Sequence, residues 1–278
     1  MSTLSIETKK ISELNAASAV SGNDTFIVDT TANGTQKLTF SALVSSLEAT
    51  DNNKLVQSIK KDMQFALGFV AYNNEVTLSN LLTAIRSGDP FAYNLGDYLT
   101  INSKKWVVIE KNYYSPIVTS TPHALLMMYD CIDTTGQMYN STATNAGGYG
   151  SSALKTYLEG TFWNSLPSEF RSAIATVNNI RESTKTSAPY SQRKIQIPNI
   201  KQIAGTSEYA ESERAFYQRF LCAQNALFLY GADHKDFWLS TPDANNNSNF
   251  GIFVAASLSA SSLAANNARC IRPFVVVK

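Results

Sequence analysis

Short apolar runs bounded by glycine, asparagine or proline fill the chain from about residue 96 onward. HALLMMYDCI (123–132) is almost continuously apolar, which is typical of a buried strand. GDYLTINSKKWVVIEKNYY (96–114) predicts a strand, a turn and a second strand. Three later runs predict closing strands: DFWLSTP (236–242), GIFVAAS (251–257) and RPFVVVK (272–278).

Helical spacing appears between these strands. A glycine loop is followed by a predicted helix, capped by Ser151 or Ser152, that places Leu154, Tyr157, Leu158 and Phe162 on one face. Two further helices are predicted from PSEFRSAIATV (167–177) and SERAFYQRFLCAQ (212–224). Because strands and helices do not alternate as β-α-β units, the fold class predicted is α+β.

The first fifty residues predict a small separate module. DTFIVDT (24–30) and QKLTF (36–40) flank Asn33-Gly34, a strong hairpin signal, and Ser41 is placed to cap a helix that follows. A hairpin and one helix are too small to bury a core of their own. We therefore expect residues 1–50 to serve as an attachment module.

Residues 51–90 predict a helical linker between this module and a large domain at 91–278. Its apolar stripe is two heptads long, too short to fold alone, and predicts an oligomerisation contact, most simply a homotrimer. The stripe consists of Leu55, Ile59, Met63, Ala66 and Val70. A second short helix is expected within 77–90, capped by Ser79 and stopped by Gly88 and Pro90.

Charge and cysteine content narrow the function classes. Charged residues make up 16% of the chain and the net charge is +1, so nothing draws it to nucleic acid or anionic lipid. The N-terminus lacks the apolar segment of a secretory signal, and no stretch has the length of a membrane helix. The cysteines, Cys131, Cys222 and Cys270, form no motif, and we expect reduced, mostly buried thiols in a protein made in a cytoplasm.

No candidate for catalysis or metal binding passes a test of spacing. GGYGSS (147–152) lacks the Gly-Lys-Ser/Thr ending of a phosphate loop and predicts a loop with a helix cap. His123 and His234 are interpreted as surface or rim residues, since no zinc or triad motif includes them. Asp130 and Asp133 with Asn140 lack the ligand spacing of a calcium loop. We expect no catalytic residue, no metal site and no cofactor.

The tryptophans are expected to be structural. Trp106 and Trp238 lie in strand-like runs and are predicted to be core residues, whereas Trp163 is predicted to lie in the core or at its rim.

Asparagines gather near the end of the chain, where DANNNSNFG (243–251) precedes a predicted strand. Either these residues form an ordinary turn, or they form a neutral polar binding surface. The binding hypothesis names Asn245, Asn246, Asn247, Asn249, Phe250, Asn266 and Asn267.

The N-terminal stretch KKISELNAASAVSGNDTFIVDTTANGTQKLTFSAL (9–43) resembles the attachment module of bacteriophage tail fibres and receptor-binding proteins. The matching positions are Ile11, Ser12, Leu14, Gly22, Asp24, Thr39, Ser41 and Leu43. The resemblance implies that this module attaches to other tail or baseplate proteins of a virion, where the chain would be located after synthesis in the bacterial cytoplasm.

Residues 93–278 resemble a domain with the C-type-lectin or formylglycine-generating-enzyme fold, to which the phage major tropism determinant also belongs. The order of segments and the closing Arg272-Pro273 before an apolar strand carry this resemblance. The enzymes of this fold hold copper with two nearby cysteines close to the C-terminus, whereas only Cys270 is found there, so a binding relative is implied. In the tropism-determinant branch the last strands and loops carry the receptor site, which some genes diversify at asparagine codons.

Together the resemblances imply a tail fibre or receptor-binding protein whose C-terminal head binds a glycan or protein on the host surface. Two alternatives stay open at this point. One is a purely structural baseplate, collar or capsid-decorating protein, and the other is a hydrolase of cell-surface polysaccharide.

Overall fold

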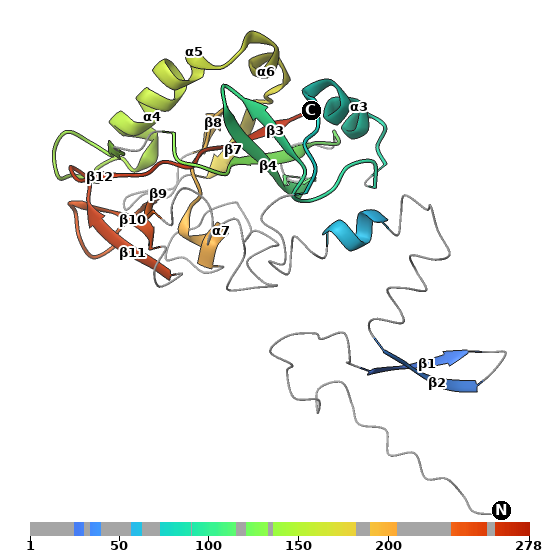
Figure 1. Ribbon diagram of the computed structural model, residues 1–278. Helices are drawn as coiled ribbons and strands as arrows, with labels where there is room; N and C mark the ends of the chain where they lie inside the picture. Colours follow the sequence, from blue (N-terminus) through green and yellow to red (C-terminus); the bar gives the residue numbers. More distant parts are fainter. Residues whose placement is uncertain are drawn as a thin grey trace, which may run out of the picture. The chain divides into compact units, whose positions relative to one another are not determined.

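The computed structural model describes residues 25–30, 34–39, 57–62, 73–89, 91–114, 121–132, 136–181, 190–204, 235–254 and 259–278. The chain divides into two compact units, Met1–Gln57 and Ser58–Lys278. Figure 1 shows the chain coloured along the sequence, with labels on many of the helices and strands. Both helices and strands occur without an alternating pattern, so the predicted α+β class is confirmed.

The strands, in chain order, are β1 (Thr25–Thr30), β2 (Gly34–Thr39), β3 (Tyr98–Ile101), β4 (Lys104–Lys111), β5 (Ala124–Met128), β6 (Gln137–Met138), β7 (Val177–Arg181), β8 (Tyr190–Arg193), β9 (Phe237–Pro242), β10 (Asn249–Val254), β11 (Ser259–Ala264), β12 (Ala268–Arg269) and β13 (Phe274–Val277). The helices are a short one at 57–62, α3 (Leu78–Arg86), η2 (Tyr149–Ser151), α4 (Ala153–Tyr157), the π-helical η3 (Leu158–Phe162), α5 (Trp163–Ser165), α6 (Ser168–Ala173) and α7 (Ile200–Ala204).

The smaller unit contains the predicted hairpin. β1 and β2 pair antiparallel, with Thr25 opposite Thr39 and Thr30 opposite Gly34. The hairpin prediction is therefore confirmed. The helix predicted after Ser41 lies outside the described residues.

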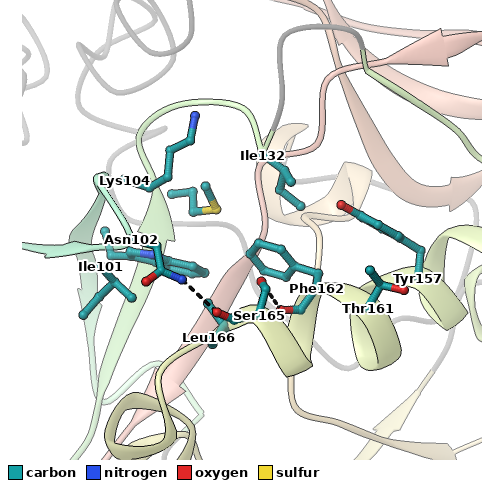
Figure 2. A pocket seen from close by; sticks show the side chains of 11 residues that line it. Ile101, Asn102, Lys104, Ile132, Tyr157, Thr161, Phe162, Ser165 and Leu166 are labelled. Carbon is teal, nitrogen blue, oxygen red and sulfur yellow. Dashed lines mark hydrogen bonds between the residues drawn. The ribbon is translucent and has the colours of Figure 1, made fainter.

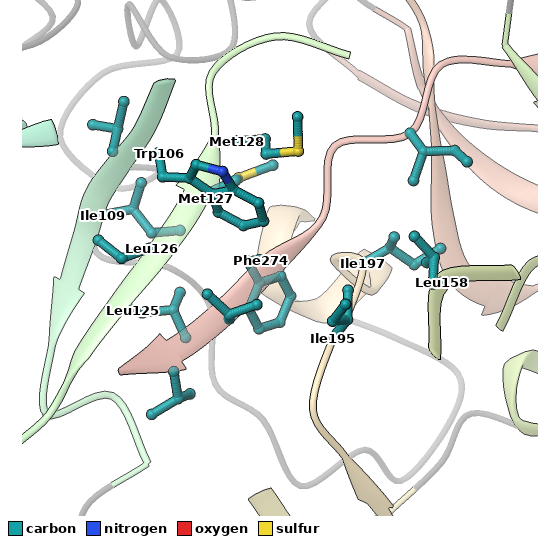
Figure 3. Packing of buried hydrophobic residues seen from close by; sticks show 14 of the residues in the cluster. Trp106, Ile109, Leu125, Leu126, Met127, Met128, Leu158, Ile195, Ile197 and Phe274 are labelled. Carbon is teal, nitrogen blue, oxygen red and sulfur yellow. The ribbon is translucent and has the colours of Figure 1, made fainter. Parts of the chain in front are cut away.

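A four-stranded antiparallel sheet in the order β13-β5-β4-β3 forms the centre of the larger unit. All five residues of β5 are buried, as the continuous apolar run predicted. Side chains from the central strands meet others from distant segments, including Leu158, Ile195 and Ile197, in one core (Figure 3). The outer edge of β13 is covered by bridges from Ile174 and Gln196, so this apolar edge is not left unpaired.

The helical segment from α4 to α6 packs against β4. The ring of Trp106 lies 5.4 Å from the ring of Phe170 and 6.4 Å from that of Phe162, and Trp106 is buried, as predicted. The helix after the glycine loop is confirmed, and Ser152 is its cap because its side chain accepts from the backbone N–H of Lys155 at 3.0 Å.

The second predicted helix is shorter than its pattern indicated. It ends at Ala173, and Ile174 bridges Val277 while Val177 begins β7. Pairing with the last strand therefore prevailed over the apolar spacing of Phe170, Ile174 and Val177. The helix predicted at 212–224 lies outside the described residues.

The predicted closing strands are confirmed. β9 and β10 form a three-stranded sheet with β11, and β13 completes the central sheet (Figure 1). Trp238 on β9 is fully buried, and its indole N–H donates to the carbonyl of Gln137 at 2.7 Å. Its predicted core position is confirmed.

Helix α3 belongs to the core of the larger unit, although the sequence placed it in a linker. Leu81 and Ile85 are each 1% exposed, and the cap is Thr77, not Ser79. The larger unit therefore begins well before residue 91.

The predicted oligomerisation stripe is described at one position only. Ile59 is 44% exposed on the helix at 57–62. Leu55, Met63, Ala66 and Val70 lie outside the described residues.

Two of the three cysteines are joined, so the expectation of reduced thiols was wrong. Cys131 follows β5 and Cys270 precedes β13, and they form a disulfide with their Cα atoms 5.4 Å apart. Both are buried, as predicted. The bond closes a separation of 139 residues, a pairing that no local spacing could reveal. Cys222 lies outside the described residues.

None of the helices formed by the described residues has the length and apolar character that crossing a bilayer demands.

Candidate functional site

The loop between β9 and β10 is built by its own polar side chains. The carboxylate of Asp243 accepts from the backbone N–H groups of Asn245 at 2.8 Å and Asn246 at 3.2 Å. The side-chain oxygen of Asn246 accepts from the N–H of Ser248 at 2.9 Å. These are local turn contacts typical of Asp and Asn, so part of the asparagine content is structural.

Asn145, from the loop before η2, fixes this turn through hydrogen bonds to its backbone. Its side chain is 4% exposed, and its Nδ2 donates to the carbonyls of Asp243, Asn246 and Asn249 at 3.1, 2.8 and 2.7 Å. Its backbone N–H donates to the carbonyl of Asn247 at 2.9 Å. One buried amide therefore fixes both ends and the middle of the asparagine-rich loop.

The second asparagine turn joins the same cluster. The N–H of Ala265 donates to the carbonyl of Ser248 at 2.9 Å, and the carbonyl of Ala265 accepts from the N–H groups of Tyr139 and Asn140. We call the assembly of residues 140–148, 243–249 and 264–268 the three-loop surface. The tertiary structure thus brings together the two asparagine segments that the sequence placed in one hypothesis.

The predicted binding residues divide into exposed and more buried groups. The exposed ones are Asn245, Asn246, Asn247, Asn266 and Asn267. Asn249 is half-buried and donates to the hydroxyl of Ser262 at 3.3 Å.

Phe250 is fully buried, with its ring stacked 3.5 Å from that of Tyr139. Its predicted receptor contact is therefore wrong, because it lies on the core side of β10.

The three-loop surface is polar and almost uncharged. Its single ionisable residue is Asp243, whose carboxylate already accepts two backbone N–H groups. The exposed side chains are amides, hydroxyls and methyl groups, which offer both donors and acceptors. Such a surface suits a hydroxyl-rich or amide-rich ligand better than an anion.

Sequence reasoning missed the third loop. Residues 147–152 were interpreted as a loop and a cap, and the cap is confirmed, but Asn145 was not singled out. The available signal was the Gly-Gly pair: Gly147 and Gly148 have φ of 76° and 65°. A Cβ on Gly147 would lie 2.5 Å from the Ser151 hydroxyl, so glycine is required where this loop turns toward Asn145.

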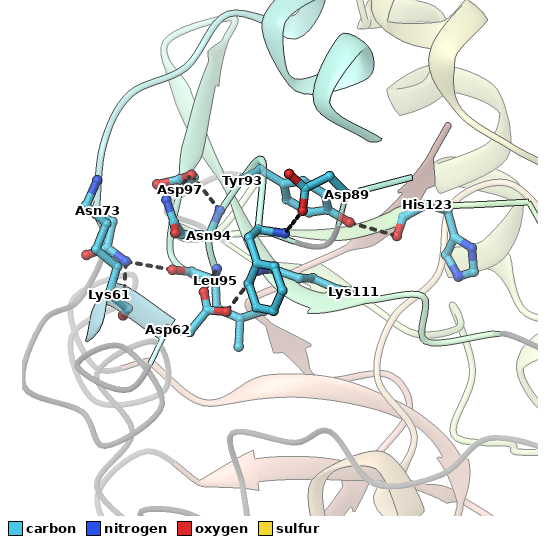
Figure 4. A network of polar contacts seen from close by, with 11 residues as sticks. Lys61, Asp62, Asn73, Asp89, Tyr93, Asn94, Leu95, Asp97, Lys111 and His123 are labelled. Carbon is cyan, nitrogen blue, oxygen red and sulfur yellow. Dashed lines mark hydrogen bonds and ion pairs between the residues drawn. The ribbon is translucent and has the colours of Figure 1, made fainter. Parts of the chain in front are cut away.

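A second polar cluster lies near the start of the larger unit (Figure 4). Asp62, from the helix at 57–62, pairs with Lys111 at 2.8 Å and accepts from the N–H of Leu95. Burial raises the pKa of Asp62 in spite of this pairing, and burial likewise raises the pKa of Asp97. The contacts tie a helix to a strand, which is a structural role.

His123 also belongs to the interior, so its interpretation as a surface or rim residue was wrong. It is 0% exposed; its Nδ1 lies 2.8 Å from the carbonyl of Thr121, and its Nε2 accepts from the N–H of Tyr114 at 3.1 Å. Burial lowers its pKa. Both nitrogens of a neutral ring are thus engaged, leaving none for proton transfer to a substrate. His234 lies outside the described residues.

Among the described residues, no group of three or more His, Cys, Asp or Glu side chains is placed to hold a metal ion. Asp133, one of the calcium candidates, lies outside them, and Asn140 instead donates to the carbonyl of Thr144 within the three-loop surface.

One family model matches the chain, over residues 121–278, more than half of its length; it is described as a domain of unknown function (DUF6273). The matched region includes all of the three-loop surface. No curated protein and no solved structure matches the chain.

Proposed function

We propose that the chain, which belongs to this DUF6273 family, is a bacteriophage tail protein that binds a receptor on the host bacterium through the three-loop surface. The observation that carries the proposal is the buried amide of Asn145, which donates to three carbonyls of the asparagine-rich loop. These contacts hold the loop in one conformation before any ligand binds.

A loop that is already fixed before binding loses less conformational entropy when the ligand binds, so association is more favourable. Here the loop is fixed by side chains that bind its backbone groups, above all those of Asn145 and Asp243, while Asn245 and Asn247 stay exposed. Neutral amides pair with sugar hydroxyls or peptide groups without releasing counterions. The proposed receptor is therefore a glycan or protein, bound with little dependence on salt.

The remaining parts of the chain fit the same role. The hairpin of the smaller unit supports the proposed attachment module, and the exposed Ile59 supports a homotrimer formed along the 51–70 segment. The C-type-lectin-like fold of the larger unit is part of the proposal. A buried disulfide persists in oxidising surroundings, which suits a particle that works outside the cell.

The test compares two triple variants of the full chain. Asn245, Asn247 and Asn266 are changed to alanine in one, and three exposed asparagines elsewhere, Asn80, Asn164 and Asn178, in the other. Both are labelled and incubated with a panel of bacterial strains, and cell-bound protein is measured.

We expect the unchanged chain to adsorb to at least one strain, and the first variant to adsorb at least tenfold more weakly, about 1.4 kcal/mol of binding. Both variants should melt near the original temperature, since exposed polar changes cost under about 0.5 kcal/mol each. Equal adsorption of the two variants would exclude the three-loop surface. Failure of the unchanged chain to adsorb to any strain would favour a purely structural virion protein.

A further inference from the structure

A separate pocket lies between the β3–β4 hairpin, the segment after β5 and the helical run from α4 to α5 (Figure 2). Its volume is about 230 Å³. It shares no residue with the three-loop surface, and the proposed receptor contact leaves it without a role.

The floor of this pocket is apolar and buried. It is formed by Trp106, Met128 and Leu166, which are at most 4% exposed, and by Phe162 at 8%. The rings of Trp106 and Phe162 lie 6.4 Å apart at 28° to each other. Ile101 and Ile132 extend this lining toward the mouth. The apolar part of a small ligand bound here would be removed from water and would make close van der Waals contacts on several sides.

One wall is the π-helical turn η3, Leu158–Phe162. Single π turns are uncommon and occur frequently at functional sites. Thr161 and Phe162 of this turn both line the pocket, together with Tyr157 before them and Ser165 after them. The irregular turn therefore shapes the cavity instead of merely interrupting the helix.

The pocket is closed on one side by the hairpin turn. Asn102 has a φ of 49°, and its amide donates to the carbonyl of Ser165 at 2.8 Å. This contact fixes the β3–β4 turn against the end of the helical wall. The cavity is thus pre-formed by contacts between segments that are far apart in the sequence.

Lys104 is the one charged side chain that lines the pocket. It is half-buried, and its Nζ donates to the carbonyl of Cys131 at 3.1 Å, which leaves two ammonium protons. Within the described part of the chain, no carboxylate forms an ion pair with it. A partly buried ammonium beside an apolar cavity would gain from an anionic group of a ligand.

We propose that this pocket binds a small carboxylic acid whose body is a single ring or a short branched chain. Its size follows from the volume, since a cavity of roughly 150 Å³ accepts benzene and drug-sized sites begin at about 300 Å³. Its charge follows from Lys104, which is the one charged side chain among the residues that line the pocket. The rim groups of Asn102 and Ser165 are already engaged with the protein, so the ammonium is the main polar attraction.

Benzoate and the neutral benzyl alcohol are the probes, measured with the full chain by calorimetry and by the fluorescence change of tryptophan, since Trp106 lies in the floor. We expect benzoate to bind with a Kd on the order of 1 mM or below, and benzyl alcohol at least tenfold more weakly. Lys104→Gln should reduce benzoate affinity to that of the alcohol. Thr161→Trp, at an exposed position of the wall, should block both probes.

Lys105→Gln provides the matched control. It removes the same charge one residue later, where the ammonium lies over the ring of Tyr98 at 5.0 Å and does not line the pocket, so benzoate binding should be unchanged. The proposal is overturned if benzoate fails to bind to the unchanged chain, or if its binding survives both Lys104→Gln and Thr161→Trp. These outcomes leave the receptor proposal untouched, because cell adsorption is measured separately.

Discussion

Replacing Asn145 by alanine tests whether one buried amide organises the three-loop surface. The change removes Nδ2, which lies between 2.7 and 3.1 Å from three carbonyl oxygens. Its two protons make two full hydrogen bonds and share the third contact, and each net bond stabilises by about 0.5–1.5 kcal/mol. With the small void left at a position that is 4% exposed, we expect a loss of about 2–3 kcal/mol.

Thermal unfolding provides the first measurement. In a unit of the size of Ser58–Lys278, 1 kcal/mol shifts Tm by about 2–4 °C, so Asn145→Ala should lower Tm by about 4–12 °C. Asn164→Ala, which removes an exposed amide from α5, is the control and should leave Tm nearly unchanged.

Hydrogen exchange separates a local effect from a general one. The backbone amides of Ser248 and Asn249 should exchange faster in Asn145→Ala, because the carbonyl acceptors around them lose their anchor. Adsorption to host cells should weaken as well, although Asn145 is too buried to touch a receptor. Unchanged Tm and unchanged exchange at these amides would refute the anchoring role, and with it the main argument for a pre-formed binding surface.

Two further perturbations test the interior. Changing Cys131 and Cys270 together to alanine should lower the unfolding free energy by as much as about 5 kcal/mol, from the loop entropy of a 139-residue separation; denaturant unfolding equal to that of the unchanged oxidised chain would contradict the bond. Acidification should act through His123, whose folded pKa lies below that of the unfolded chain because burial favours the neutral ring. The unfolded chain therefore binds the proton first, and stability should be fully present above about pH 6.5 and fall below it, by no more than about 1.4 kcal/mol per pH unit from this group. Unfolding measured at pH 7 and pH 5 should differ less in His123→Gln than in the unchanged chain, and an equal difference in both would show that other groups cause the loss.

The sequence by itself determined the elements whose signals are local. The β3–β4 hairpin follows from two apolar runs around an Asn-Ser turn, and Asn102 and Ser103 both take the positive φ that this turn requires. The buried β5 follows from its uninterrupted apolar run, and the start of α4 from the capping hydroxyl of Ser152. Each of these depends on residues a few positions apart, so the pattern contains the necessary information.

The tertiary structure decided everything that depends on distant partners. α6 ends early because Ile174 pairs with the last strand. Cys131 forms its disulfide with Cys270, which lies 139 residues later in the sequence. His123 is buried because several segments close over it, although the residues just before it in the sequence are polar or proline.

In the candidate site, too, some features follow from the local sequence and others only from tertiary packing. Composition alone identified the asparagine-rich segments, and exposure of Asn245 and Asn266 agrees with that hypothesis without testing it. The sequence could not assign Phe250 to the core or Asn145 to the loop, because the face of a strand and the target of a buried amide are set by packing. An amide about a hundred residues away becomes the anchor only when folding removes water from it and supplies carbonyls within hydrogen-bonding distance.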